Sequence, residues 1–302
     1  MARVNRLMPP GYFLLLNLWG RAVSWEPAAL RVLSLLVGAL GVCMTYRLGR
    51  DLFGKRMGLA SAALLGTSSM VVYYMHELRM YAAVPFLTAL MLWAYFRVVN
   101  SSEKQGVGVW LALLAGAAGL LYTHYFAGIA VIALGGYHLL FAPKTRRWWQ
   151  VTGLLIVAGL LFLPWGIAVL TAGGGGTTGE SENALRVLDA IYRIGMNFAN
   201  GNFLAFALVC VFALMARSSN ARRVIILTLL LLLLYIVANV ALQVLHGGRL
   251  RYVLALWTPL ALVSAIGLRQ LSRWRVKDRL VRRTRRVHRA HRRRPVREYL
   301  RA

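Results

Sequence analysis

Apolar runs long enough to cross a bilayer alternate with short polar connections along most of the 302-residue chain. A transmembrane helix needs roughly 20 mainly apolar residues, and about 17 is the lower limit. In lipid, a helix satisfies its own backbone hydrogen bonds. The pattern therefore predicts an all-α, polytopic membrane helix bundle of about nine spans, at 28–47, 57–74, 80–98, 108–123, 125–141, 151–170, 203–216, 223–245 and 250–268.

Two segments look like helices that lie in the membrane interface instead of crossing it. Near the N-terminus, Pro9-Pro10 predicts a turn, and the apolar segment that follows is too short to span. In the connection 171–202, apolar residues recur at helical spacing over 184–198. We therefore divide the chain into an outer-face interfacial segment (1–27), a transmembrane domain (28–268, with the outer loop 171–202) and a basic tail (269–302).

Composition supports the membrane class and adds an uneven charge. Hydrophobic residues make up 59% of the chain and the net charge is +27. Fifteen Lys and Arg lie between Arg269 and Arg301, against two acids, Asp278 and Glu298. Such a tail beside a span either binds anionic lipid headgroups or stays solvated and only sets orientation. Nucleic acid is a third partner class, and we do not expect it.

The basic residues alternate between the two sides of the predicted bundle. Every second connection, together with the tail, holds 27 of the 36 Lys and Arg. Basic residues concentrate in cytoplasmic connections, so these segments and the C-terminus are predicted to be cytoplasmic. The protein is then a multi-pass protein of the cell (inner or plasma) membrane. The outer connections include 73–81, 123–125, 171–202 and 246–251.

The outer connection Tyr73–Tyr81 carries the most concentrated chemistry in the sequence. Only nine Asp and Glu occur in the whole chain, and Glu77 lies here, between two predicted spans. Charged groups at membrane depth are costly unless they are paired or hydrated, so they indicate a functional site. Glu77 is a candidate general base, or it forms an ion pair with Arg79 or Arg251 that holds two loops together. The simpler alternative is a polar loop at the membrane surface.

Arginines at the outer ends are candidates for holding a phosphate. A guanidinium can contact two phosphate oxygens at once, which suits Arg79, Arg249 and Arg251, although arginines also anchor span ends to lipid headgroups. The tyrosines either stack on a sugar ring or form the interfacial aromatic belt. His76, His124 and His246 lack ligand spacing, so we predict no metal and no cofactor.

The order of the outer motifs resembles bacterial family 39-like glycosyltransferases of the GT-C superfamily, relatives of protein O-mannosyltransferases and of the lipid A aminoarabinose transferase. The matching segments are Pro9–Leu16, Arg31–Ser34, Tyr46–Gly54, Tyr74–Tyr81 (similar to a Glu-x-Arg-x-Tyr loop), Thr123–Phe126, and Arg251-Tyr252 with Pro259. The resemblance implies transfer of a sugar from a polyprenyl-phosphate carrier to a hydroxyl acceptor on the outer face. It implies a donor site of Arg79, Tyr81, His124, Arg251 and Tyr252. The family's principal catalytic acid has no counterpart in this sequence, and Glu77 is the best remaining carboxylate for the catalytic role.

The resemblance also implies a segment that this chain does not contain. The family normally begins with a further span and an acidic outer loop, and a His commonly precedes Pro-Pro, where Met8 stands here. We therefore expect that the chain lacks this N-terminal span and loop, and that it is either a glycosyltransferase or the truncated, inactive remainder of one. The alternative is a non-catalytic membrane protein (a transporter, flippase or degenerate homologue) that binds a lipid-linked sugar.

Overall fold

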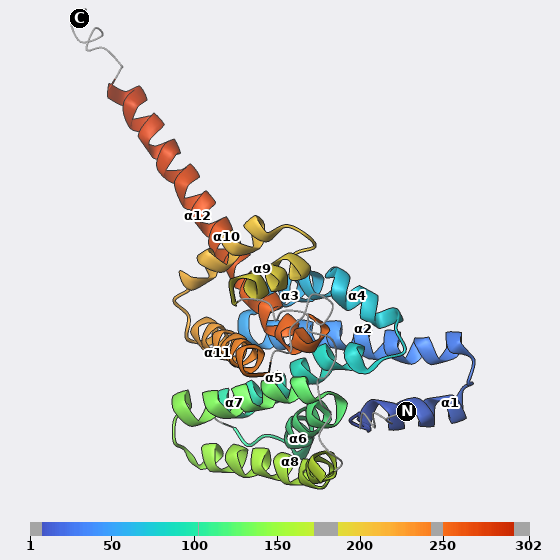
Figure 1. Ribbon diagram of the computed structural model, residues 1–302. Coiled ribbons are helices and arrows are strands. Elements are labelled where there is room, and N and C mark those ends of the chain that lie inside the picture. Colours follow the sequence, from blue (N-terminus) through green and yellow to red (C-terminus); the bar gives the residue numbers. More distant parts are fainter. Residues whose placement is uncertain (1–7, 102, 172–186, 243–249, 293–302) are drawn as a thin grey trace, which may run out of the picture.

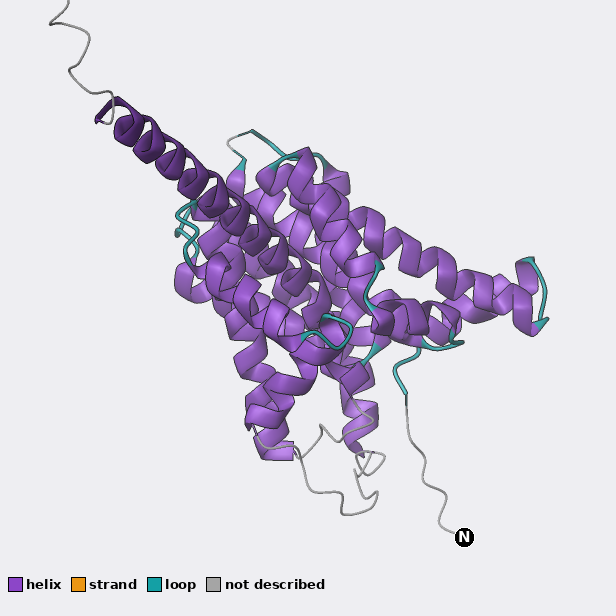
Figure 2. Ribbon diagram, turned by 90° about the horizontal axis from the view of Figure 1, so that it is seen from above, coloured by secondary structure: helices purple, strands orange, loops and turns teal. Residues whose placement is uncertain are grey.

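The computed structural model describes residues 8–101, 103–171, 187–242 and 250–292, with side chains described as far as Trp274. All regular structure in these ranges is helical, as predicted (Figures 1 and 2). The elements are α1 Gly11–Ala22, α2 Pro27–Phe53, α3 Lys55–Gly66, α4 Ser69–His76, η1 Met80–Ala82, α5 Ala83–Asn100, α6 Val107–Thr123, η2 Tyr125–Ala127, α7 Gly128–Phe141, α8 Arg146–Thr171, α9 Val187–Phe198, α10 Phe203–Leu214, α11 Ser219–Leu242, η3 Leu250–Leu256 and α12 Trp257–Arg292, where η marks a 3₁₀ helix.

Every predicted span falls on a helix or on a pair of helices, but the count of nine is not confirmed. Five helices in the described part are long and apolar enough to cross a membrane, and two bent pairs raise the number to seven. Helices α6 and α7 are apolar but shorter. The predicted span 203–216 is α10, which has only 12 residues and turns by 98° from α9. Helix α9 corresponds to the predicted interfacial helix.

The predicted second span is not one straight helix. Helix α3 ends at Gly66, α4 begins at Ser69, and the two are bent by 63°. The side chain of Asn200 fills the break: it accepts a hydrogen bond from the Ser69 backbone N–H and donates one to the Thr67 carbonyl, both at 2.8 Å. Trp257 Nε1 also donates to Ser68 Oγ at 2.9 Å. Partners distant in sequence thus satisfy the backbone groups that the break releases.

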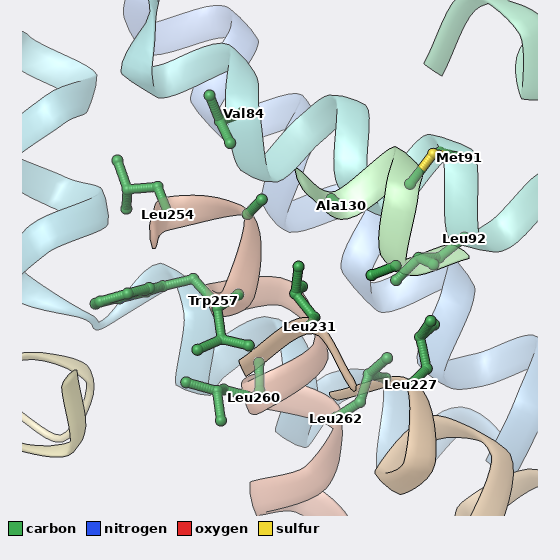
Figure 3. Packing of buried hydrophobic residues seen from close by; sticks show 14 of the residues in the cluster. Val84, Met91, Leu92, Ala130, Leu227, Leu231, Leu254, Trp257, Leu260 and Leu262 are labelled. Carbon is green, nitrogen blue, oxygen red and sulfur yellow. The ribbon is translucent and has the colours of Figure 1, made fainter. Parts of the chain in front are cut away.

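The core lies where α5, α7, α11, η3 and α12 meet (Figure 3). Its largest fully buried side chain is Trp257, at the start of α12. Elsewhere small residues allow backbones to approach closely: a Cβ on Gly58 of α3 would lie 2.7 Å from the Tyr46 carbonyl oxygen of α2. This agrees with the Gly- and Ser-rich sequence of α3 and is typical of helix packing in membranes.

The connections predicted to be cytoplasmic gather at one end of the bundle, here called the basic end. Its connections are residues 54, 101–106, 142–145 and 215–218. Hydrogen bonds link them: Asn220 Nδ2 to the Leu52 carbonyl at 3.2 Å, Arg223 to Asn100 Oδ1 at 2.5 Å, and Arg147 to the Glu103 carbonyl at 2.6 Å. Helix α12 leaves the bundle as a long projecting helix (Figure 1). Its backbone is helical to Arg292, so much of the basic tail is helix.

Candidate active site

The Tyr73–Tyr81 stretch forms the turn between α4 and α5. Helix α4 ends at His76, and the Arg79 backbone N–H donates to the Glu77 carbonyl at 2.8 Å, which closes a tight turn. The 3₁₀ helix η1 then places Tyr81 inside the protein, where only 4% of its surface is exposed. Short 3₁₀ segments are common at helix ends and in connections. Tyr74 and Tyr81 therefore lie inside the protein, whereas Tyr73, Glu77 and Arg79 lie nearer the surface.

Three connections far apart in sequence bring six side chains together, and we call them the Arg251 cluster. Tyr81 from η1 lies against His124 from the α6–η2 connection, with ring centroids 5.4 Å apart. His124 in turn lies 5.0 Å from Tyr252 of η3. The members are Tyr74, Tyr81, His124, Phe126, Arg251 and Tyr252. Of the residues predicted for the donor site, this cluster brings together Tyr81, His124, Arg251 and Tyr252.

Arg251 lies among phenol rings. Its guanidinium carbon is 5.7 Å from the ring centre of Tyr81 and 5.5 Å from that of Tyr252. Tyr74 is a third phenol within electrostatic reach of Arg251. Aromatic faces stabilise a cation without neutralising its charge. The arrangement presents a positioned positive charge, which suits a phosphate.

His124 is neutral at physiological pH. The residue is 7% exposed, and burial, followed by the positive charge of Arg251, lowers the pKa of its imidazole to about 4. A neutral imidazole can donate one hydrogen bond and accept another. His124 therefore contributes ring contacts and hydrogen-bonding capacity to the cluster, but no charge.

Glu77 and Arg79 pair with each other outside the cluster core. Arg79 Nε lies 3.8 Å from a Glu77 carboxylate oxygen, and the two side chains are 55% and 37% exposed, respectively. A long contact between exposed groups contributes about 0–1 kcal/mol. Of the two ion-pair alternatives for Glu77, the structure contains the pair with Arg79, which links neighbours within one turn. Glu77 remains accessible to a substrate.

The N-terminal end of α1 docks beside this site, which the sequence did not reveal. The Tyr12 hydroxyl and Ser34 Oγ of α2 are 2.5 Å apart, and both residues are buried. A Cβ on Gly11 would lie 2.8 Å from the Tyr122 carbonyl oxygen, two residues before His124, so the close approach requires glycine. The Pro-Pro-Gly-Tyr motif indicated a turn here. Local sequence could not show that Tyr12 would contact Ser34 or that Gly11 would pack against Tyr122.

The remaining candidates lie elsewhere. Arg249 and His246 are outside the described residues. His76 is exposed and hydrogen-bonds through Nδ1 to the Val72 carbonyl at 2.8 Å, and Tyr125 accepts from Trp165 Nε1 at 3.3 Å. Among the described residues, no group of three or more His, Cys, Asp or Glu is placed to hold a metal ion.

Comparison with known proteins gives one family and one fold. The family model of dolichyl-phosphate-mannose-protein mannosyltransferases matches residues 8–171, more than half of the chain. The crystal structure of ArnT from Cupriavidus metallidurans in the apo state is similar with a TM-score of 0.67 and 16% identity, over 90% of this chain and 51% of that chain. ArnT from the same organism bound to undecaprenyl phosphate gives a TM-score of 0.62 and 15% identity, over 90% and 53%.

The chain thus spans about half the length of ArnT. At this identity, the likeness to ArnT shows the fold alone. No curated protein sequence matches the chain.

Proposed function

This chain belongs to the dolichyl-phosphate-mannose-protein mannosyltransferase family, and from that membership we propose that it acts in transferring a sugar from a polyprenyl-phosphate carrier to a hydroxyl acceptor. The family match and the ArnT-like helical fold confirm the resemblance to GT-C glycosyltransferases. We further propose that it lies in the cell membrane with the basic end in the cytoplasm, because basic residues concentrate there.

The Arg251 cluster is the observation that carries the proposal. A carrier lipid offers a negative phosphate at the end of a long apolar chain. The cluster offers a guanidinium that lies among three phenols at the end of the bundle opposite the basic end, and apolar helices adjoin it. Undecaprenyl phosphate is the ligand of one ArnT structure with this fold. We propose that Arg251 binds the carrier phosphate here, with Arg79 as a second cation, while Tyr81, His124 and Tyr252 line the sugar.

The chemistry needs one base and one cation. The acceptor oxygen attacks the anomeric carbon, the bond from that carbon to the phosphate oxygen breaks, and the polyprenyl phosphate leaves with the bonding electrons. A carboxylate must take the acceptor proton, and Glu77 is the one we propose. Arg251 would stabilise the negative charge that grows on the departing phosphate, as preorganised cations do in such reactions.

The Glu77–Arg79 pair supports a second candidate function. A carboxylate that serves only to order its turn would leave a chain that binds a lipid-linked sugar without transferring it. Both functions require the Arg251 cluster for carrier binding, and only sugar transfer also requires Glu77 as the base. Substitution of Glu77 by Gln, which keeps the size and removes the base, separates them.

Carrier binding is the first test. Purified chain in detergent micelles is titrated with undecaprenyl phosphate, and bound lipid is quantified by native mass spectrometry. Arg251→Gln removes a charge-assisted contact of about 1.5–3 kcal/mol, so affinity should fall about 10- to 100-fold. Arg193→Gln is the matched control, because Arg193 pairs with Asp189 on α9, outside the cluster. Equal affinity for the two variants would refute the assignment of Arg251.

Sugar transfer is the second test. The chain is incubated with a polyprenyl-phosphate sugar and hydroxyl acceptors, and release of polyprenyl phosphate is followed. Loss of release in Glu77→Gln, with carrier binding unchanged, supports transfer with Glu77 as the base. Binding without release in the unsubstituted chain supports the second candidate.

A further inference from the structure

Two hollows flank α12 where it leaves the bundle at the basic end, far from the Arg251 cluster along α12. One has a volume of about 700 Å³ and the other about 450 Å³. Both are lined by Phe53, Met57, Arg269 and Arg273, so α12 forms their common wall. The two hollows therefore form one site that straddles a helix.

Five cations from three segments line this site. Lys55 and Arg56 come from the start of α3, Arg217 from the α10–α11 connection, and Arg269 and Arg273 from α12. The four ion pairs between described residues involve none of the five. The nearest acid in sequence, Asp51, already lies within ion-pair distance of Arg50 and Arg97. Like charges held together repel, so the site favours an anion.

Apolar side chains line the larger hollow together with these cations. Met57 is buried, while Leu268 lines the hollow and is 41% exposed, so an apolar surface continues outward from it. Trp274, one helical turn after Gln270, is 56% exposed. Its ring centroid lies 6.1 Å from that of Phe212 of α10. Tryptophan at this position is typical of the membrane–water interface. A ligand here meets positive charge and apolar surface together.

We propose that this site binds an anionic glycerophospholipid, with the headgroup phosphate held by Arg269 and Arg273. Basic pockets between helices on the cytoplasmic side of membrane proteins bind acidic headgroups. The apolar wall favours a lipid over a free phosphate ester, which has no group to place against Met57 and Leu268. The proposal differs from general attraction of the basic tail to the membrane, since it depends on residues at one place in α12. It does not depend on sugar transfer.

The test is a titration of the detergent-solubilised full chain with phosphatidylglycerol, with bound lipid counted by native mass spectrometry. At about 1 kcal/mol per basic residue, Arg269→Gln with Arg273→Gln should weaken binding about thirtyfold. The matched control is Arg285→Gln with Arg286→Gln, which removes the same charge from the tail beyond the site and should leave binding within threefold. Arg269→Lys with Arg273→Lys keeps the charge and should retain most of the affinity, and size-exclusion profiles verify folding.

Three results would overturn the proposal. Equal weakening by the pocket and tail variants would mean that only overall charge matters. Equal binding of zwitterionic phosphatidylethanolamine would remove the role of the cations. Competition by glycerol 3-phosphate at the same concentration as the lipid would mean that the site takes a free phosphate ester.

Discussion

Asn200 offers the sharpest test of how this bundle is held together. It lies in the α9–α10 turn, yet its side chain makes both hydrogen bonds that close the break between α3 and α4. Its own φ is 52°, a left-handed conformation that Asn tolerates and Ala does not. Asn200→Ala therefore loses two hydrogen bonds, about 1 kcal/mol each, and adds backbone strain of about 1–2 kcal/mol. The expected loss of unfolding free energy is roughly 3–4 kcal/mol.

Asn200→Gly divides this loss into its two parts. Glycine accepts the positive φ but cannot make the hydrogen bonds, so it should lose only about 2 kcal/mol. Both variants and the unsubstituted chain are compared by equilibrium unfolding in mixed micelles, followed by tryptophan fluorescence. The reasoning is refuted if Asn200→Ala unfolds within 0.5 kcal/mol of the unsubstituted chain. It is also refuted in part if the Ala and Gly variants are equally unstable, because the strain contribution would then be absent.

Three further predictions address the packing, the site and the basic end. Gly58→Ala should cost about 1–3 kcal/mol in the same unfolding assay because the new Cβ meets the Tyr46 carbonyl, whereas Gly153→Ala, with open space around it, should not destabilise. His124 has a folded-state pKa near 4, below its ordinary 6.5, so its contribution to stability is complete above pH 6.5 and falls as the pH drops toward 4. The unsubstituted chain should therefore lose roughly 2 kcal/mol more than His124→Gln between pH 7 and 4.5, and parallel curves would contradict the burial argument. Asp51→Asn should lower the free energy of unfolding by about 1 kcal/mol, because the Asp51 carboxylate contacts Arg50, Arg97 and the Trp93 indole N–H. This loss should be smaller at high salt, and a loss that does not change with salt would count against an ionic origin.

The members of the candidate site could be chosen from the sequence, but their grouping could not. Tyr81, His124, Arg251 and Tyr252 come from three separate connections that were predicted to lie on one side, and they meet in the structure. Glu77 and Arg79 were placed with them and instead pair at the edge, since the turn after His76 directs them outward. Tyr12 was not selected, because its partner Ser34 lies 22 residues away and no local pattern marks such a contact.

The sequence alone determined the all-helical membrane class and the division of the connections into two ends. Both follow from local properties: apolar length decides whether a helix suits a bilayer, and basic residues concentrate on one side. Only the tertiary structure decided that the second predicted span is broken at Thr67 and Ser68, because small and hydroxyl residues such as those at 66–69 also occur inside unbroken membrane helices. A residue in the α9–α10 turn and an indole from α12 satisfy the released backbone and side-chain groups. Such partners are distant in sequence, and only packing brings them together.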